Sequence, residues 1–310
     1  MQSVQNHIYI IGSGAIGKAL AVFLKLSGKD VTLIRGTIND GTTKIERIYV
    51  EMADGIIHQA DIVVTTLDTF STISGIIILA NKSFGNEQLA VLLKHKIGNS
   101  PIVLFQNGLG VEQPFVNHQY REIYRCVLFV TSQIIDPVTV RFKPVAICPI
   151  GIEKGNKNHL GNIVSQLSTP DFGFKSELNI QHIIWKKTIV NCVFNSICPL
   201  LEVDNGVFHR NAEARKIARR VISECIAIAI AKGIDLNADE VETSLLQISR
   251  LSDGQDISTL QDIRNNRKTE IETLHPAIVR IAESLNKGKL VRETRLLGEL
   301  TKIKTHINIQ

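Results

Sequence analysis

The sequence belongs to the α/β class, with a doubly wound parallel sheet in its first half and an all-helical domain after it. Three observations predict this. A G-x-G-x-x-G segment stands between a short apolar strand and a helical stretch, and β-branched runs alternate with helical stretches through the first half. Long amphipathic stretches without β-rich runs then follow. Because 310 residues exceed one ordinary core, we predict a Rossmann-type domain over residues 1–175 and a helical domain over residues 176–310.

The predicted elements follow from these patterns. The first strand and helix cover residues 8–11 and 15–27, and Gly28 stands where a C-terminal helix glycine is expected. A further pair of strands is expected between residues 36 and 70. The other predicted strands are 31–34, 62–66, 76–80, 102–105 and 127–131. The predicted helices of the second domain are 180–196, 212–232, 238–247, 255–267 and 269–286.

Composition and charge restrict the partners. The net charge of +5 comes from scattered Lys and Arg without a basic stripe, and aromatic residues are few, so no nucleic acid is expected. The most apolar helical stretch, residues 221–231, contains Glu224 and is too short to span a bilayer. Residues 1–6 are polar and show no targeting signal. We therefore expect no membrane partner.

The cysteines and histidines indicate a compartment and argue against a metal. Five cysteines, an odd number without C-x-x-C spacing, indicate reduced thiols in the cytoplasm rather than disulfides or a zinc site. The nine histidines show no metal-ligand spacing. No metal is expected.

The glycine-rich segment predicts a dinucleotide site. Its glycines permit a tight turn, close approach of a pyrophosphate and close packing of the helix on the strand. The helix that follows offers free N–H groups and the positive end of its dipole to phosphate. The alternative is a tight turn without a ligand. The residues of the predicted site are Gly12, Ser13, Gly14, Ala15, Ile16 and Gly17.

The end of the second strand indicates which dinucleotide is bound. NAD sites usually carry a carboxylate there, which binds the ribose hydroxyls. Here Arg35 follows the strand, and no carboxylate occurs until Asp40. An arginine can hold a 2′-phosphate through two charge-assisted hydrogen bonds, so the pattern favours NADPH. The alternative is a solvated surface arginine.

Two other segments carry polar residues that could take part in catalysis or substrate binding. Lys187, Asn191 and Asn195 are four residues apart, and each is displaced by about 40° from the last on a helix. They form one polar row on a mostly apolar helix, which could protonate a carbonyl oxygen and bind a hydroxy acid. A solvated helix face is the alternative. Asn107 follows a predicted strand at its carboxyl end, where open α/β sheets bind ligands, although Asn-Gly is often only a turn.

Taken in order, these motifs resemble the ketopantoate (2-dehydropantoate) reductase family. The resemblance runs from Ile8 to about Ile271, with similar spacing between the blocks. The matching blocks are G-x-G-x-x-G, then K-S-F at Lys82, Q-N-G-L-G around Asn107, W-K-K-x-x-x-N-x-x-x-N from Trp185, and S-x-L-Q-D-I-R-x-x-R-x-T-E-I from Ser258.

The resemblance implies a function and a role for each matched residue. It implies NADPH-dependent reduction of 2-dehydropantoate to pantoate, a step toward pantothenate and coenzyme A. Lys187 would be the general acid, and Glu270 would close the site by bonding cofactor or substrate. Residues implied to bind the substrate are Asn107, Asn191, Asn195, Asn205 and Ser258. Residues implied to hold the cofactor, besides the glycine loop and Asn107, are Arg35, Lys82, Glu270 and, on a looser alignment, Ser132.

Departures from the family pattern leave alternatives open. Residues 196–199 replace the usual Pro-Leu-Thr-Ala, Ile257 stands where a second serine is common, and His275-Pro276 stands where a glycine is usual. A reductase of another branched 2-keto acid is the first alternative, and a non-catalytic NADPH-binding regulatory protein is the second. Family members occur as monomers or homodimers, and the sequence reveals no exposed apolar helix face that would serve as an interface.

Overall fold

The computed structural model describes residues 7–36 and 38–309, without the side chains of residues 308 and 309, and divides into two compact units. The first unit contains the described residues up to Gln106 together with Val111–Ile180. The second contains Asn107–Gly110 and the chain from Gln181 onward. The division at Ile180 lies close to the predicted boundary, and the short segment Asn107–Gly110 groups with the helical unit.

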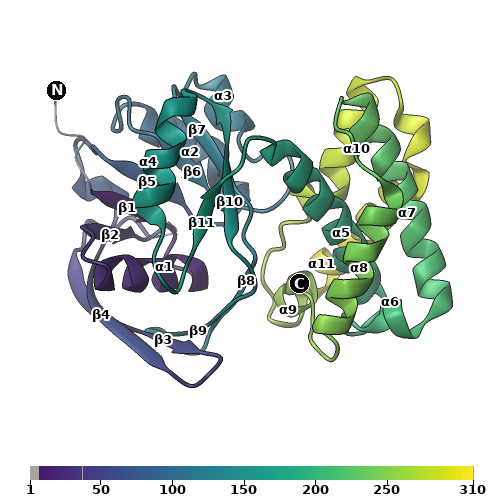
Figure 1. Ribbon diagram of the computed structural model, residues 1–310, viewed down its shortest axis with the longest axis horizontal. Coiled ribbons are helices and arrows are strands. Elements are labelled where there is room, and N and C mark those ends of the chain that lie inside the picture. Colours follow the sequence, from purple (N-terminus) through teal and green to yellow (C-terminus); the bar gives the residue numbers. More distant parts are fainter. Residues whose placement is uncertain (1–6, 37, 310) are drawn as a thin grey trace. The chain divides into compact units, whose positions relative to one another are not determined.

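The described part of the first unit is built on one mixed sheet of 11 strands (Figure 1). Its order is β11-β10-β7-β6-β5-β1-β2-β4-β3-β9-β8, and neighbours from β7 to β4 run parallel. The pairs β3–β4, β7–β10 and β8–β9 are antiparallel. The strands are β1 (Ile8–Ile11), β2 (Val31–Ile34), β3 (Lys44–Met52), β4 (Ile57–Thr65), β5 (Ile76–Leu79), β6 (Ile102–Leu104), β7 (Ile123–Cys126), β8 (Val130–Ile134), β9 (Thr139–Pro144), β10 (Cys148–Lys154) and β11 (Phe174–Ser176).

Both faces of the sheet are covered, which makes the fold doubly wound. Side chains alternate along each strand, so Ile76 and Ile78 of β5 join one core while Ile77 and Leu79 join the other. The first core is completed by helices α1 (Ala15–Leu26) and α4 (Lys157–Leu167). The second core is completed by α2 (Asn86–Lys94) and α3 (Gln113–Asn117). Short 3₁₀ turns cover Leu67–Thr69 (η1) and Ser83–Gly85 (η2). The predicted α/β class is confirmed.

Two details of the sheet differ from or extend the prediction. The predicted strand 127–131 is wrong, because β7 ends at Cys126 and β8 begins at Val130, with an irregular connection between them. A continuous apolar run does not reveal where a strand leaves one neighbour for another. The pair of strands expected between residues 36 and 70 is present as the β3–β4 hairpin, which curves around α1 with β9 and β8 (Figure 1).

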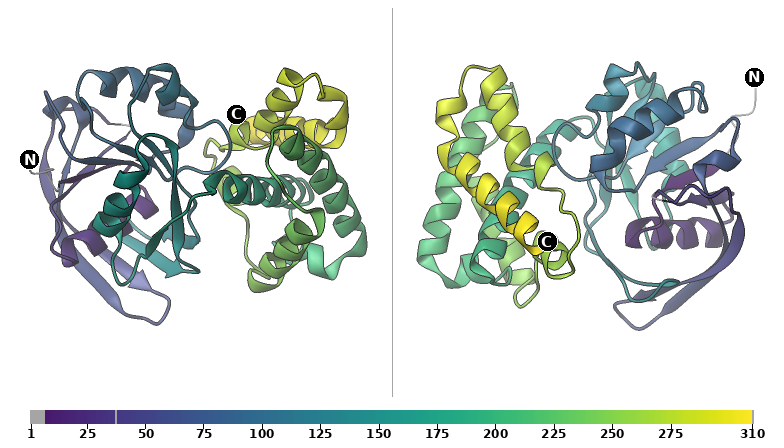
Figure 2. Two further views of the ribbon diagram at one scale, coloured as in Figure 1. Left: turned by 45° about the horizontal axis from the view of Figure 1, so that its top comes forward. Right: turned by 180° about the vertical axis from the view of Figure 1, so that it is seen from behind.

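Among the described residues of the second unit, all regular secondary structure is helical (Figure 2). Its 22-residue helix α5 carries the polar row that the sequence analysis singled out. The helices are α5 (Ile180–Leu201), α6 (Val207–Arg210), α7 (Ala212–Ala231), α8 (Ala238–Leu251), α9 (Ser258–Arg264), α10 (His275–Ser284) and α11 (Arg292–Ile309), with 3₁₀ turns η3 (Ile271–Thr273) and η4 (Gly288–Leu290).

The end of the chain departs most from the sequence prediction. The predicted helix 269–286 begins only at His275, because residues 269–270 are non-helical, η3 follows, and Leu274 has a non-helical backbone (φ −105°, ψ −108°). Pro276 lies in the first turn of α10. Helix α11 was not predicted. The side that α11 buries carries Thr294, Gly298, Thr301 and Thr305, while its regularly spaced apolar residues face outward. The expectation of no exposed apolar helix face is therefore wrong.

Candidate active site

The glycine loop has the geometry that a dinucleotide site requires. Gly12 has φ +120°, and a Cβ there would lie 2.4 Å from the backbone nitrogen of Asn81. A Cβ on Gly17 would lie 1.9 Å from the carbonyl oxygen of Gly12, so only glycine lets the helix pack this closely on the turn. A Cβ on Gly14 would meet nothing within 4 Å, which leaves this position open to a ligand.

Helix α1 starts directly at this open position. Gly14 is its N-cap residue, and no acidic side chain lies in its first turn. The backbone N–H groups of Ala15 and Ile16 have no acceptor earlier in the helix, as at every helix start. These groups and the helix dipole favour an anion such as a pyrophosphate beside Gly14. Ser13, Ala15 and Ile16 are partly buried around it.

Arg35, after β2, is engaged by a carboxylate that the sequence analysis had set aside. Its Nη2 atom lies 2.8 Å from Oδ1 of Asp40 and also contacts Thr42. Hydrogen bonds from the Thr42 hydroxyl and backbone, and the nearby Arg35 guanidinium, lower the pKa of Asp40. The Nε atom of Arg35 is buried without a hydrogen-bond partner. Asp40 was missed as a contact because a ribose-binding acid is sought at the strand end itself; the signal for it is Asp-x-Thr, a local turn motif.

Lys82 and Ser132 come from different parts of the first unit. Lys82 is exposed and lies at the N-terminal end of η2, after β5. Ser132 lies on the edge strand β8, which packs against α1, and its hydroxyl is buried without a partner. Ser132 thus lies on a strand that contacts the helix starting at the glycine loop.

A buried amide network holds the strand end that precedes Asn107. Asn86 and Gln106 exchange two hydrogen bonds of 2.7 and 2.8 Å, and Gln106 also donates to the backbone oxygen of Asn81. Asn107 itself is exposed. This network went unnoticed in the sequence because isolated amides carry no spacing pattern.

Within the second unit, the polar row of α5 is confirmed as one face of one helix. Lys187 and Asn191 are partly buried, and Asn195 is 3% exposed. Asn195 donates its side-chain N–H to the backbone oxygen of Asn191 at 3.0 Å. The neighbouring Lys186 instead forms an ion pair with Glu240, so its charge is compensated and it is a poor candidate for lowering the pKa of Lys187.

Asn195 joins the two segments that the sequence analysis had considered separately. Its Oδ1 atom accepts hydrogen bonds from the Thr259 backbone at 3.3 Å and from the Ser258 hydroxyl at 3.4 Å. Both donors lie at the start of α9, whose own N-cap residue, Ile257, has no side chain that can cap. Where the family often has serine, Ile257 cannot cap α9, and Asn195 of α5 caps it instead.

Asn205 offers a hydrogen-bond acceptor without a partner. Its backbone is fixed, since its N–H donates to Gln255 and its oxygen accepts from Ser249. The residue is only 6% exposed, yet its side-chain oxygen Oδ1 has no partner. Burying such an atom costs free energy, and a ligand hydroxyl would recover it.

The segments around Glu270 and Asn107 meet in the second unit. The backbone oxygen of Glu270 accepts hydrogen bonds from the hydroxyl and N–H of Thr273. Thr273 in turn accepts from the N–H of Leu109 at 2.9 Å. Gly108 has φ +94°, and a Cβ there would lie 2.3 Å from Thr273 Oγ1. Position 108 must therefore be glycine, because the chain passes too close to Thr273 for a side chain. Asn107 and Glu270 lie in two segments that contact each other.

His275, one of the family departures, is a core residue. It is completely buried, and its Cβ leaves no room for a side chain on Gly298 of α11. Burial lowers the pKa of His275 to about 4, partly offset by the nearby Cys192 backbone. Neither ring nitrogen has a full hydrogen bond.

Residues 7–36 and 38–309 contain no group of three His, Cys, Asp or Glu side chains arranged for a metal, and their five cysteines are buried and free. Helices within the same ranges are all too short or too polar to cross a membrane.

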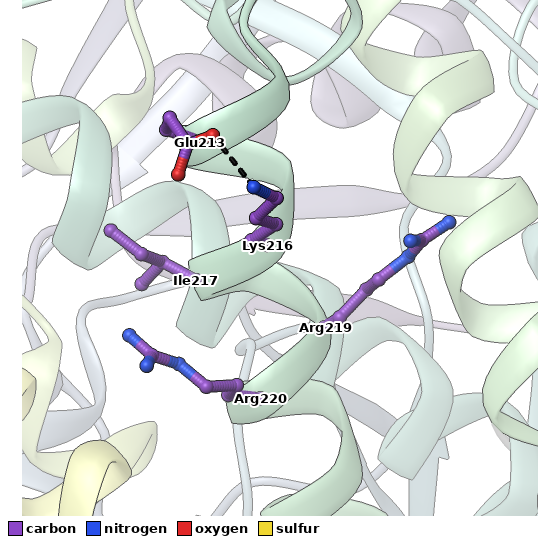
Figure 3. A pocket seen from close by; sticks show the side chains of 5 residues that line it. All are labelled: Glu213, Lys216, Ile217, Arg219 and Arg220. Atoms are coloured by element: carbon purple, nitrogen blue, oxygen red, sulfur yellow. Dashed lines mark hydrogen bonds and ion pairs between the residues drawn. The ribbon is translucent and has the colours of Figure 1, made fainter.

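A hollow of about 530 Å³ along α7 holds none of the predicted site residues (Figure 3). Its charges are paired, since Glu213 binds Lys216, Arg219 binds Glu242 and Arg220 binds Glu293. It is not a candidate for the active site.

Comparison with protein families decides the assignment. Residues 8–152 match the family "Ketopantoate reductase PanE/ApbA", and residues 179–290 match its C-terminal domain. The chain belongs to the ketopantoate reductase PanE/ApbA family. It is therefore an oxidoreductase with a Rossmann fold.

Curated relatives and solved structures agree with this family. The 2-dehydropantoate 2-reductases of Pyrococcus horikoshii and Pyrococcus abyssi are 28% and 26% identical, covering 90% of this chain and 91% and 92% of theirs. A PanE/ApbA ketopantoate reductase from Ralstonia eutropha has a TM-score of 0.85 at 21% identity, covering 98% and 100%.

Two further structures share the fold. A dimeric ketopantoate reductase from Staphylococcus aureus has a TM-score of 0.81 at 21% identity, covering 97% and 99%. A D-mandelate dehydrogenase with NADH and anilino(oxo)acetate has a TM-score of 0.81 at 22% identity, with the same coverage. At these identities the likeness shows the fold alone.

Proposed function

We propose that this protein reduces 2-dehydropantoate to pantoate with NADPH, in the cytoplasmic synthesis of pantothenate and coenzyme A. The observation that carries the proposal is the row of Lys187, Asn191 and Asn195 on α5, joined by Asn195 to Ser258. A positive charge next to several amide and hydroxyl groups suits a small 2-keto acid with a hydroxyl group. The curated Pyrococcus relatives bear the name of this reaction.

The chemistry of the residues fits the proposed reaction. When bound, NADPH supplies a hydride to the keto carbon. Negative charge then develops on the carbonyl oxygen, and the Lys187 ammonium stabilises this charge and donates a proton to the oxygen. Asn191, Asn195 and Ser258 bind the substrate carboxylate and hydroxyl. The unpartnered Oδ1 of Asn205 accepts a hydrogen bond from a substrate hydroxyl.

The proposed general acid is tested with two neighbouring lysines. Lys187→Ala should lower the turnover of NADPH with ketopantoate by two or more orders of magnitude, the usual scale for removing a general acid. Lys186→Ala, which removes the lysine paired with Glu240, is the matched control and should stay within a few-fold of wild type. Equal losses in the two variants would contradict a specific role for Lys187.

The cofactor preference rests on Arg35 and the glycine loop. The open face of Gly14 and the start of α1 suit the pyrophosphate, and Arg35 and Lys82 suit the 2′-phosphate. Because Asp40 is neutralised by Arg35, it is a weak candidate for binding the ribose of NADH. The D-mandelate dehydrogenase of the same fold holds NADH, so the preference must come from this chain's own residues.

Asp40 and a 2′-phosphate compete for the same guanidinium in this proposal. Asp40→Asn should therefore tighten NADPH binding several-fold and leave NADH binding nearly unchanged, whereas Arg35→Ala should weaken NADPH binding at least tenfold. Titration of both cofactors by fluorescence measures these changes. An Asp40→Asn variant that loses affinity for NADH but not for NADPH would instead assign Asp40 to the ribose.

A reductase of another branched 2-keto acid is the second candidate. The family departures at 196–199 are buried in α5 up to Pro199, close to the polar row, and favour a changed pocket. Relative kcat/KM values across a panel of 2-keto acids discriminate the two candidates. Tight NADPH binding without turnover of any panel member would support the non-catalytic alternative.

We also propose that the protein forms a homodimer. The support is the dimeric ketopantoate reductase of Staphylococcus aureus, which shares this fold. Sedimentation velocity tests this directly.

A further inference from the structure

Helix α11 buries a side made of threonines and a glycine and exposes its apolar side. Its buried side consists of Thr294, Gly298, Thr301 and Thr305, three of which are threonines. The hydroxyls of Thr301 and Thr305 bond back to carbonyl oxygens of α11 itself, and that of Thr294 donates to Glu224. These hydroxyls are therefore satisfied within the unit, and the helix packs stably without an apolar inner face.

The opposite side of α11 is apolar and exposed. Leu296, Leu300, Ile303 and Ile307 are 56, 42, 53 and 66% exposed. Their spacing of four, three and four residues places them within a narrow band along the helix, in the pattern of a coiled-coil seam. Helix α11 lies at the surface of the helical unit, coloured yellow in Figure 2. We call these four residues the α11 stripe.

We propose that the α11 stripe is the interface with a second copy of this chain, whose α11 lies antiparallel against it. This rests on the homodimer proposed above and gives it a location. The spacing of four, three and four residues is the same from either end of the stripe. A two-fold axis between Leu300 and Ile303 therefore pairs these two across the interface and sets Leu296 against Ile307, so each copy presents the same surface.

The charges beside the stripe fit the same arrangement. Glu299 and His306 are exposed on one flank, displaced from the stripe toward the same side. In the antiparallel pair, Glu299 of each copy faces His306 of the other, so an imidazole N–H donates to a carboxylate on both sides of the axis. A parallel pair would instead bring opposite flanks together and set Glu299 against Lys304 of the other copy, whose ammonium is already paired with Glu202 of its own chain.

The opposite flank is also compatible with a neighbour. Lys304 is held by an ion pair of 2.7 Å with Glu202 of its own chain, so its ammonium is compensated and its apolar stem borders the stripe. Leu297, partly buried, borders the stripe on the same flank. Family-model matches end at residue 290, so α11 lies outside the segment to which the catalytic residues belong.

The first test is sedimentation velocity of the full chain over a wide range of concentrations. We expect a monomer–dimer equilibrium in wild type, and at least a hundredfold weaker association in Leu300→Lys/Ile303→Lys. Leu251→Lys, at a 70% exposed apolar residue on α8, is the matched control and should associate like wild type. A wild type that stays monomeric, or a dimer that the double variant does not weaken, overturns the proposal.

A charge exchange tests the orientation without disturbing the apolar residues. Glu299→Lys should weaken dimerisation about two- to fivefold, the scale of an exposed ion pair, and adding His306→Glu should restore it. Mixing Leu296→Cys and Ile307→Cys chains with a short bis-maleimide should yield the mixed cross-link. Cross-links formed only between identical chains would show a parallel pair and overturn the antiparallel arrangement.

Turnover is measured beside association, so that the two proposals fail separately. If the protein is active but stays monomeric, the proposed interface is refuted and the proposed reaction stands. If the dimer depends on the stripe but shows no turnover, the proposed interface stands and the proposed reaction is refuted.

Discussion

At the scale of single residues, the chain shows how a buried polar atom can be either structural or functional. His275 and Asn205 both bury unpartnered atoms. His275 is enclosed on all sides by the core of the helical unit, where α10 meets α11, so its cost is structural. Asn205 belongs to the proposed substrate site, where its acceptor is proposed to meet a substrate hydroxyl.

The burial of His275 predicts a pH dependence of stability. Its pKa falls to about 4 in the folded protein, against 6.5 as the ordinary value, so the folded state disfavours the proton. Between pH 6.5 and 4 the unfolded chain binds a proton that the folded chain excludes, and stability is lost as the pH falls. The full loss is roughly 3 kcal/mol.

Urea unfolding at several pH values measures this effect. His275→Gln, which does not titrate, should remove the part of the pH dependence that lies between pH 6.5 and 4. An unchanged slope in the variant would assign the effect to other groups, such as the carboxylates with lowered pKa values at Asp204 and Glu240.

At the scale of elements, α5 and α9 depend on one side chain. Asn195 caps α9 from a different helix because Ile257, at the N-cap position, cannot. A helix without a cap loses free energy, and here the cap residue also belongs to the proposed substrate site. The element and the site are therefore stabilised by the same contact.

This dual role predicts different effects for two asparagines. Asn195→Ala should lower the free energy of unfolding by about 1–2 kcal/mol and also raise KM for the keto acid. Asn191→Ala, one turn away and partly buried, should raise KM with less than about 0.5 kcal/mol change in stability. Chemical denaturation and steady-state kinetics of both variants check this, and an unchanged stability of Asn195→Ala would refute the capping role.

At the scale of the whole molecule, the chain forms two compact units, and the proposed site residues are divided between them. The proposed cofactor residues other than Asn107 and Glu270 lie in the first unit, and the proposed acid and substrate residues lie in the second. A ligand stabilises the unit that binds it by mass action.

Calorimetry with NADPH should therefore affect the units unequally. NADPH at a hundred times its Kd adds about 2.7 kcal/mol, which should raise the unfolding temperature of the first unit by about 5–10 °C and leave a second transition in place. Arg35→Ala should reduce the rise in unfolding temperature that NADPH causes. A single transition that moves as a whole would show that the two units unfold together.

The sequence by itself determined the class of fold, the glycine loop and the polar row of α5. These are local patterns: a strand, a tight turn and a helix adjoin in the chain, and residues four apart on a helix share a face whatever surrounds it. The order of the motifs also indicated the family. The pair of strands after Arg35 and the starts of α1, α5, α7 and α8 followed the same local rules.

Tertiary structure alone decided which distant residues meet. The contacts of Asn195 with the start of α9 and of Gly108 with Thr273 depend on how the chain folds back on itself. The burial of His275 and the exposure of the α11 stripe have the same origin. Whether a helix turns its apolar side inward is set by what packs against its other side, and no local pattern contains that information.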